Sequence, residues 1–224
     1  MTESTPAQGK ESPPPEPAQE ADEGFLADLP LAILESVRQH DRPTEVLEDE
    51  DLTASLPRRL GLTGVVESQI HRYRLARKRR ERIPSADVTD LLRLVLRRPD
   101  SEAILREAGR DLARHQGRNL LYRVATAARL LPDSVSTRLA KRALQRVMRR
   151  IGGGAPIRVT RDPIRVEAND LVTARADEYG VACVLYAAAI EEAVQHAMGR
   201  RPTVSHVTCE ARGQDVCAWE VVEV

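Results

Sequence analysis

The sequence contains no long hydrophobic run. None of its 224 residues lies in an apolar stretch near the roughly 18 residues that a membrane-spanning helix needs. The polar segment 1–5 also lacks the pattern of a signal peptide. Hydrophobic residues make up 42% of the chain and charged residues 30%, as in ordinary globular proteins. We therefore expect a cytoplasmic protein without a membrane span, built as one sizeable domain with appendages.

Aromatic residues are scarce, with one Phe, one Trp and four Tyr. A ligand pocket in this chain would therefore be lined mainly by aliphatic side chains, which suits a hydrophobic, hydrocarbon-like small molecule better than a ligand held by ring stacking. An excess of charge of either sign is also missing, because acidic and basic residues balance at 34 each. This balance argues against non-specific nucleic-acid binding by the molecule as a whole.

Familiar catalytic motifs are absent as well. Gly152–Gly154 lacks the lysine and the strand-to-helix context of a phosphate-binding loop and instead predicts the end of a helix. The sequence contains neither a Gly-x-Ser-x-Gly elbow nor a His-Glu-x-x-His helix. Glu191 and Glu192 are adjacent and would not share a helix face, so they do not form an acid–base pair. The sequence favours a binding protein over an enzyme.

The chain does have a candidate metal site in its last 42 residues, formed by Cys183, His206, Cys209 and Cys217. Cys209 and Cys217 flank a turn at Gly213, in a segment whose alternation predicts an antiparallel hairpin. Cys183 opens a predicted helix, and the unpaired N–H groups of a helix start favour a thiolate. Three thiolates and an imidazole form a closed tetrahedral set, typical of a structural Zn²⁺ site.

Alternatives to this zinc site stay open. The cysteines could be buried free thiols, or two of them could form a disulfide, although the odd count and the lack of a secretion signal disfavour pairing. His206 is the weakest ligand, because strict strand alternation would place it and Cys209 on opposite faces unless the strand bends. A nearby carboxylate such as Glu210 could complete the site instead.

Composition divides the chain into three expected regions. Residues 1–23 are rich in proline and glutamate and predict a disordered tail. Residues 24–83 predict a helical arm, which contains a short apolar helix at 25–37, able to dock on a partner, and an acidic segment at 45–51. Residues 84–224 form the expected ligand-binding domain.

A basic run at residues 71–82 is the second feature able to carry a function. Val66, Ile70 and Tyr73 recur at the spacing of an amphipathic helix, whose arginine-rich face could bind phosphates or an acidic partner. The alternative is a solvated face neutralised by the acidic segment at 45–51. No helix-turn-helix signature surrounds the run, so nucleic-acid binding through it is not favoured.

The domain after residue 83 begins with helices and ends with strands. Proline and glycine residues mark the ends of four predicted helices. The first ends before Pro99, and the other three span 101–117, 119–131 and 133–151. Two short strands, or one strand with a break at Pro163, are predicted at 157–159 and 164–166. The helix from Cys183 and the terminal hairpin follow. This order predicts an α+β fold, with N-terminal helices packed on a small antiparallel sheet and a C-terminal zinc-knuckle hairpin.

Residues 109–224 resemble the vinyl-4-reductase (4-vinyl reductase) domain family. The matching features are Glu107-Ala-Gly-Arg110, the long helix ending in three glycines, the paired strands around 157–168, the Cys183 helix and the Cys-x7-Cys hairpin. Members of this family bind small molecules, include the sensory domain of aromatic-responsive bacterial activators, and are related to transport-particle subunits. The resemblance implies Cys183, His206, Cys209 and Cys217 as zinc ligands, with His206 where zinc-binding members have a carboxylate. It also implies a hydrophobic small ligand.

We therefore predict a zinc-stabilised regulatory or sensor protein that binds a hydrophobic small molecule and has no catalytic site of its own. A homodimer and a protein partner for the N-terminal arm are further expectations, because the sequence shows no output domain. One alternative is an enzyme or accessory in the vinyl reduction of tetrapyrroles such as bacteriochlorophyll precursors, as the family name suggests. Another is a nucleic-acid-associated regulator that uses residues 71–82.

Overall fold

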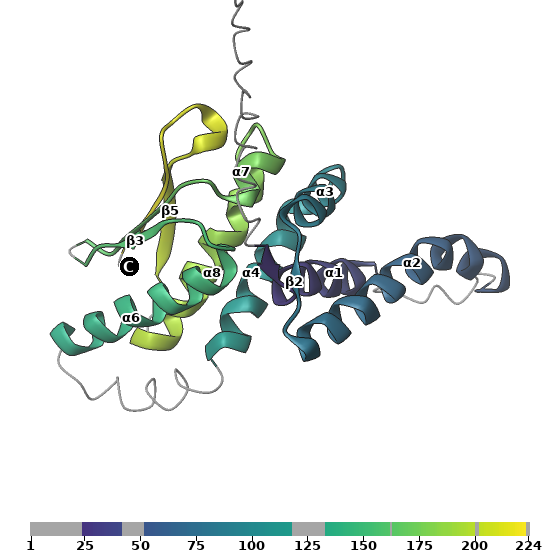
Figure 1. The fold of residues 1–224 in the computed structure, drawn as a ribbon, viewed down its shortest axis with the longest axis horizontal. Helices are drawn as coiled ribbons and strands as arrows, with labels where there is room; N and C mark the ends of the chain where they lie inside the picture. The colour runs from purple at the N-terminus through teal and green to yellow at the C-terminus, as the bar shows by residue number, and fades with distance from the viewer. Residues whose placement is uncertain (1–23, 42–51, 118–132, 162, 200–201, 223–224) are drawn as a thin grey trace, which may run out of the picture.

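The computed structural model describes residues 24–41, 52–117, 133–161, 163–199 and 202–222. In these residues the chain is an α+β protein, as the sequence predicts, with helices packed against a small antiparallel sheet (Figure 1). The predicted tail at 1–23, the acidic segment at 45–51 and the predicted helix at 119–131 lie outside the described residues. None of the described helices is long and apolar enough to cross a membrane.

The N-terminal part of the described chain consists of β1 (Phe25–Leu26), α1 (Asp28–His40), α2 (Leu52–Arg79) and β2 (Arg82–Ile83). Strands β1 and β2 pair antiparallel. The predicted short apolar helix is α1, which is buried along most of its length and packs against both α2 and α4 (Ser101–Gly117). Ser36 Oγ donates a buried hydrogen bond of 2.8 Å to the carbonyl oxygen of Ile104. Helix α1 therefore shares a core with residues on both sides of the predicted boundary at 83 and 84.

The remaining helical elements are α3 (Ser85–Leu96), α6 (Asp133–Ile151), α7 (Val172–Ala176), the 3-10 turn η1 (Val181–Cys183) and α8 (Val184–Met198). Helices α3, α4 and α6 end where Pro99, Gly117 and the three glycines predict. Helix α7 was not predicted, because five residues are too few for a periodic pattern. Helix α8 packs against both α4 and α6, and most of its side chains are buried.

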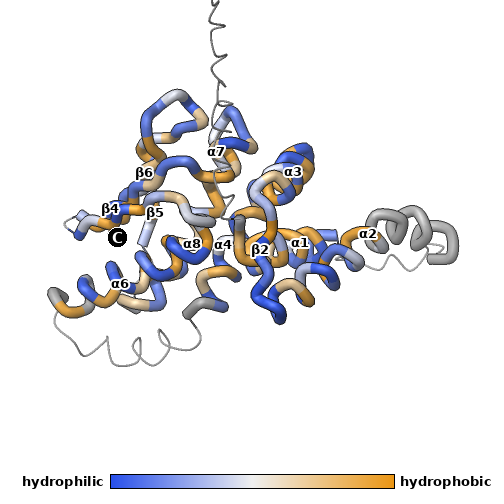
Figure 2. Tube along the Cα trace, viewed as in Figure 1, coloured by the Kyte–Doolittle hydropathy of each residue, from blue (hydrophilic) through white to orange (hydrophobic). Residues whose placement is uncertain are grey.

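The larger sheet contains β3 (Ile157–Val159), β4 (Arg165–Ala168), β5 (Thr203–Thr208) and β6 (Cys217–Val222) in the order β3-β4-β6-β5. All neighbouring strands are antiparallel. On the inner face, Val166 lies opposite Trp219, and both side chains are fully buried. On the outer face, Arg165 donates a hydrogen bond of 2.8 Å to Glu220. Hydrophobic residues also gather where α1, β2 and α4 meet (Figure 2).

The basic run lies on the C-terminal half of α2 and on β2. Ile70 and Tyr73 are buried, as their spacing predicts. The opposite face carries the cations, several of which pair with acids of neighbouring elements. Arg74 lies 2.7 Å from Glu35, Arg72 lies 3.4 Å from Asp87, and Arg77 and Asp28 are 4.0 Å apart. Acids of α1 and α3 therefore neutralise much of this run, which leaves less charge for a phosphate partner.

Candidate metal centre

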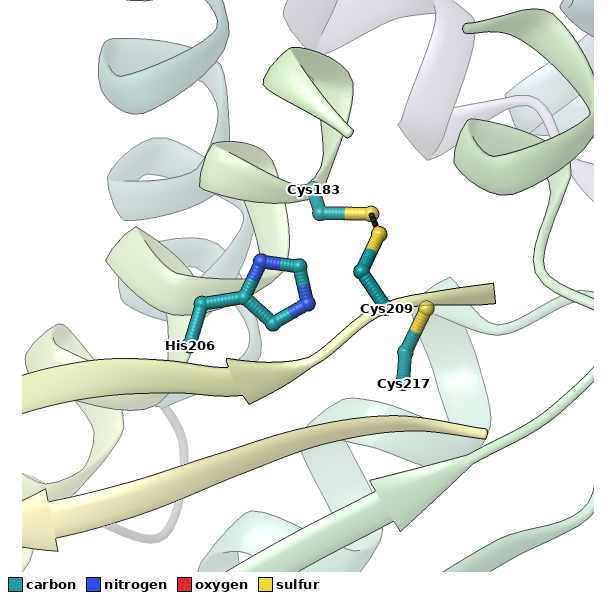
Figure 3. Close-up of side chains that lie close together, drawn as sticks. All are labelled: Cys183, His206, Cys209 and Cys217. Atoms are coloured by element: carbon teal, nitrogen blue, oxygen red, sulfur yellow. Dashed lines mark hydrogen bonds between the residues drawn. The ribbon is translucent and has the colours of Figure 1, made fainter. Parts of the chain in front are cut away.

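Four side chains from three parts of the fold meet beside the inner face of the sheet (Figure 3). Cys183 ends η1 and precedes α8, His206 lies on β5, Cys209 follows β5, and Cys217 begins β6. One ligand atom from each residue lies within 4.8 Å of all the others. The structure therefore brings together all four residues that the sequence proposes, and we refer to them as the metal centre.

A β-bulge in β5 explains how His206 reaches this cluster. His206 pairs with Trp219, but the next pair joins Thr208 to Ala218, so β5 has one extra residue at Val207. The extra residue shifts the alternation by one position. His206 and Cys209 consequently lie on the same side of the hairpin, although regular alternation would separate them. The strand therefore has the irregularity that His206 needs in order to lie on the same face as Cys209.

The centre is closed to solvent on the sulfur side. The three cysteines are at most 1% exposed, and no disulfide joins them. Cys183 Sγ and Cys209 Sγ lie 3.9 Å apart, which is far longer than a sulfur–sulfur bond of about 2.05 Å. The Nε2 atom of His206 is buried and has no hydrogen-bond partner among the described residues. In Figure 3 this edge of the ring faces the sulfur atoms. An imidazole nitrogen left in this position is available as a metal ligand.

The three thiols differ in acidity because they share hydrogen bonds. The Cys183 thiol, the neighbouring His206 imidazole and the backbone N–H of Glu210 hold the pKa of Cys217 well below its usual range. The contact with Cys217, together with burial, raises the pKa of Cys183. Burial also raises the pKa of Cys209. Negative charge therefore gathers at Cys217, where it would attract a cation.

Neighbouring groups hold the sulfur atoms in place. Thr173 Oγ1 lies 3.4 Å from Cys183 Sγ, and the Glu210 N–H lies 3.4 Å from Cys217 Sγ. The Cys209 N–H donates to Gln214 Oε1 at 2.9 Å, which closes the loop between the two hairpin cysteines. Such surrounding hydrogen bonds orient the ligands of a metal site. No sequence pattern marks Thr173, which belongs to the unpredicted helix α7.

The turn before Cys183 fits closely around the centre. Asp177 accepts hydrogen bonds from the N–H groups of Tyr179 and Ala182, at 2.9 and 2.7 Å. Gly180 adopts a left-handed conformation with φ of 77°. A Cβ atom at Gly180 would lie only 2.7 Å from Cys209 Sγ. This glycine therefore provides both the turn and the space for the sulfur, a need that an isolated Asp-x-x-Gly sequence does not reveal.

Glu210, the alternative fourth ligand, lies beside the centre. Its Oε1 accepts a hydrogen bond of 2.9 Å from the Asp170 N–H, and its Oε2 lies 3.8 Å from Cys217 Sγ. Burial raises the pKa of this carboxyl group, and the nearby Cys217 raises it further. The carboxylate is thus engaged by Asp170, whereas His206 offers an unpaired nitrogen. The geometry favours His206 as the fourth ligand.

A cleft of about 640 Å³ lies close to the metal centre. Its described lining includes Phe25, Ser85, Ala86, Thr89, Asp90, Arg93, the segment 152–156, Asp170 and Arg175. Phe25 packs directly on the backbone of Gly153, so the N-terminal strand forms part of the wall. Arg175 donates a hydrogen bond of 2.9 Å to Ser85 Oγ. The lining mixes apolar with charged groups and is less aliphatic than the composition predicts.

The chain matches none of the known proteins with which it was compared. No protein-family model matches the chain, and neither a curated protein nor a solved structure matches it. The resemblance to the vinyl-4-reductase domain family accordingly stays a prediction from the sequence. What the structure contributes independently is a buried cluster of three cysteines and one histidine that could hold a metal ion.

Proposed function

We propose that this chain is a zinc-stabilised regulatory protein that binds a small molecule. The observation that carries the proposal is the convergence of Cys183, His206, Cys209 and Cys217, whose ligand atoms lie within 4.8 Å of one another. A metal ion at this point would bind the start of α8 to both strands of the C-terminal hairpin. It would thereby hold the hairpin loop that contains Glu210 beside Asp170, which lines the cleft.

Zinc is the metal that this donor set fits best. Sulfur and imidazole nitrogen are the ligands of structural zinc sites, and four of them complete a tetrahedron. Two sulfurs bound to one tetrahedral zinc ion lie about 3.8 Å apart, given zinc–sulfur bonds of about 2.3 Å. The Cys183 and Cys209 sulfurs are already 3.9 Å apart. When bound, the ion would supply cross-linking and charge neutralisation, because a closed set leaves no position for a reacting water.

The neighbouring cleft supports the ligand-binding part of the proposal. Its volume of about 640 Å³ is that of a small-molecule site. Ala86, Ala155 and Pro156 provide apolar lining. Arg93 and Arg175 provide polar groups, and they lie 3.4 and 3.7 Å from Asp90 and Asp170 of the same lining. We therefore propose a hydrophobic small molecule with a polar or anionic group. The resemblance to a small-molecule-binding family, noted from the sequence, agrees with this class of ligand.

A short series of contacts connects the cleft with the metal centre. Asp170 lines the cleft and donates its N–H to Glu210 Oε1 at 2.9 Å. Glu210 in turn donates its own N–H to Cys217 Sγ. Asp170 and Glu210 thus connect the cleft with Cys217 of the metal centre. The position of Phe25 in the same cleft supports coupling of an occupied cleft to the N-terminal segment, and from there to a protein partner.

Native mass spectrometry of the purified chain, beside its denatured mass, tests this function. We expect an excess mass of one zinc ion per chain that disappears in Cys209→Ser and persists in the control Ser205→Ala, which changes an exposed position of β5. A metal-free chain with three titratable thiols would contradict the zinc assignment. The same spectrum reports any co-purified organic molecule and the oligomeric state.

The ligand is tested separately with the zinc-loaded chain. Thermal unfolding in the presence of medium-chain alkanoic acids, which combine an apolar body with an anionic group, should show stabilisation by mass action. Arg175→Gln should reduce this stabilisation, because Arg175 lines the cleft. A zinc-loaded chain that carries no organic adduct and gains no stability from these acids would contradict the ligand-binding proposal while leaving the zinc assignment intact.

A further inference from the structure

Helix α6 carries an exposed cationic surface that the proposed function does not use. Between Arg138 and Arg150 this helix has six cationic residues, and Asp133 is its only acid. Its apolar side chains, such as Leu144 and Met148, are buried against the rest of the fold. The outer side of the helix is therefore charged with a single sign.

Four of these residues form one continuous stripe, namely Arg138, Arg142, Arg146 and Arg149. At 3.6 residues per turn, these positions fall within an arc of about 80° and extend over about 16 Å along the helix axis. All four side chains are exposed. We refer to them as the arginine stripe.

The arginine stripe differs from the basic run on α2 in having no acidic partner within the described part of the chain. Arg72, Arg74 and Arg77 pair with acids of α1 and α3. On α6, Arg150 pairs with Asp28 at 3.4 Å. The four arginines of the stripe form no ion pair or hydrogen bond with any residue that the structure describes. Their charge is therefore available to another molecule, although the chain as a whole is neutral.

We propose that the arginine stripe binds the phosphate backbone of nucleic acid without reading its sequence. Guanidinium groups bind phosphate oxygens in a bidentate manner, and a row of them suits a row of phosphates. Insertion into a membrane interface would use exposed apolar residues on the same face, and a tightly bound protein partner would use an apolar or aromatic anchor. Among the described residues of α6, Val135 is the one exposed large hydrophobic side chain, at 37%, whereas Leu144 and Val147 are buried. Phosphate contacts alone are the interaction that this face offers.

The salt dependence of DNA binding by the full, zinc-loaded chain tests the proposal. The probe is a fluorescein-labelled DNA duplex of about 20 base pairs, and the measurement is fluorescence anisotropy. If each arginine of the stripe neutralises one phosphate, the binding constant should fall about 150-fold between about 50 and 200 mM salt, a logarithmic slope of about −3.6. In the double variant Arg142→Gln, Arg146→Gln the fall should be only about 12-fold, a slope of about −1.8.

A matched control removes the same charge from α2. The double variant Arg72→Gln, Arg79→Gln changes two exposed cations that pair with Asp87 and Glu81, and it should keep the full slope. Circular dichroism and zinc content should be unchanged in both variants, because all four positions are exposed. Absence of DNA binding at low salt, an unchanged slope in the α6 variant, or equal losses in both variants would overturn the proposal. Tighter binding to polyglutamate or to phosphatidylserine vesicles than to DNA would overturn it as well.

Discussion

The imidazole of His206 stacks on the indole of Trp219, with ring centroids 4.9 Å apart and planes inclined by 11°. The two residues are cross-strand neighbours in the β5–β6 hairpin. Stacking on a fully buried indole restricts the histidine ring to the plane in which Nε2 faces the sulfur atoms. Trp219 therefore positions a candidate metal ligand without belonging to the four-residue cluster itself.

Replacement of Trp219 should weaken metal binding although the four ligands remain. In Trp219→Leu we expect the affinity for Zn²⁺ to fall about 10-fold to 100-fold, as for other groups that orient metal ligands. Competition with a chromophoric chelator measures this change. Tyr186→Phe is the control, because it keeps the neighbouring ring and removes only a hydroxyl 3.5 Å from the Ile151 carbonyl oxygen. Equal affinity in Trp219→Leu and the unmodified chain would show that the stacking has no such role.

Substitution of His206 should show whether it is the fourth ligand. We expect His206→Ala to lower zinc affinity by more than about 100-fold, beyond the range typical of supporting residues. His206→Cys should retain the metal, and with Co²⁺ its absorption should change from a three-sulfur to a four-sulfur spectrum. The comparison variant is Glu210→Gln. If that variant loses the metal while His206→Ala keeps it, the carboxylate and not the imidazole is the ligand.

Two glycines with similar backbone conformation should differ in their tolerance of alanine. Gly180 and Gly213 have φ values of 77° and 84°. A Cβ atom at Gly180 would lie 2.7 Å from Cys209 Sγ, whereas a Cβ atom at Gly213 would meet no atom within 4 Å. Gly213→Ala should cost about 1–2 kcal/mol of unfolding free energy from backbone strain alone. Gly180→Ala should cost at least about 1 kcal/mol more, because Cys209 Sγ must move. Chemical denaturation measures both, and equal losses would contradict the close fit at Gly180.

The hydrogen bond between Ser36 and Ile104 tests whether the predicted arm unfolds with the rest of the chain. Ser36→Ala should lower the unfolding free energy by about 1 kcal/mol. The only tryptophan, Trp219, lies in the distant sheet and reports its unfolding by fluorescence. We expect the Trp219 transition to shift together with the loss of helical signal. A shift in helical signal without any shift at Trp219 would mean that residues 24–83 unfold separately.

The ends of helices α3, α4 and α6 could be predicted from the sequence because local signals mark them. Pro99 and the glycines at 117 and 152 interrupt the apolar periodicity, and α3, α4 and α6 end there. The burial of Ile70 and Tyr73 followed from the same periodicity. The position of α1 between α2 and α4 did not, because an apolar helix face predicts burial without naming the surface that buries it.

The four residues of the metal centre could be predicted from their residue types, but their geometry could not. Cys183, Cys209 and Cys217 are the only cysteines of the chain, and their chemistry singles them out. The supporting residues Thr173, Asp177 and Gly180 are common residue types whose roles depend on tertiary contacts. The bulge at Val207 had no marker either, because bulged β5 still has the β-branched composition of a regular strand.

The same extra residue has a consequence for assembly. In the described sheet β5 has a partner only on the β6 side, so its other side presents free backbone groups that could template a strand from another chain. At Val207 the spacing of these groups is broken, and the strand twists away from a straight edge. The irregularity that turns the imidazole toward the sulfurs therefore also protects the molecule against edge-to-edge aggregation. Two copies that paired through β5 would have to accommodate this break in the ladder.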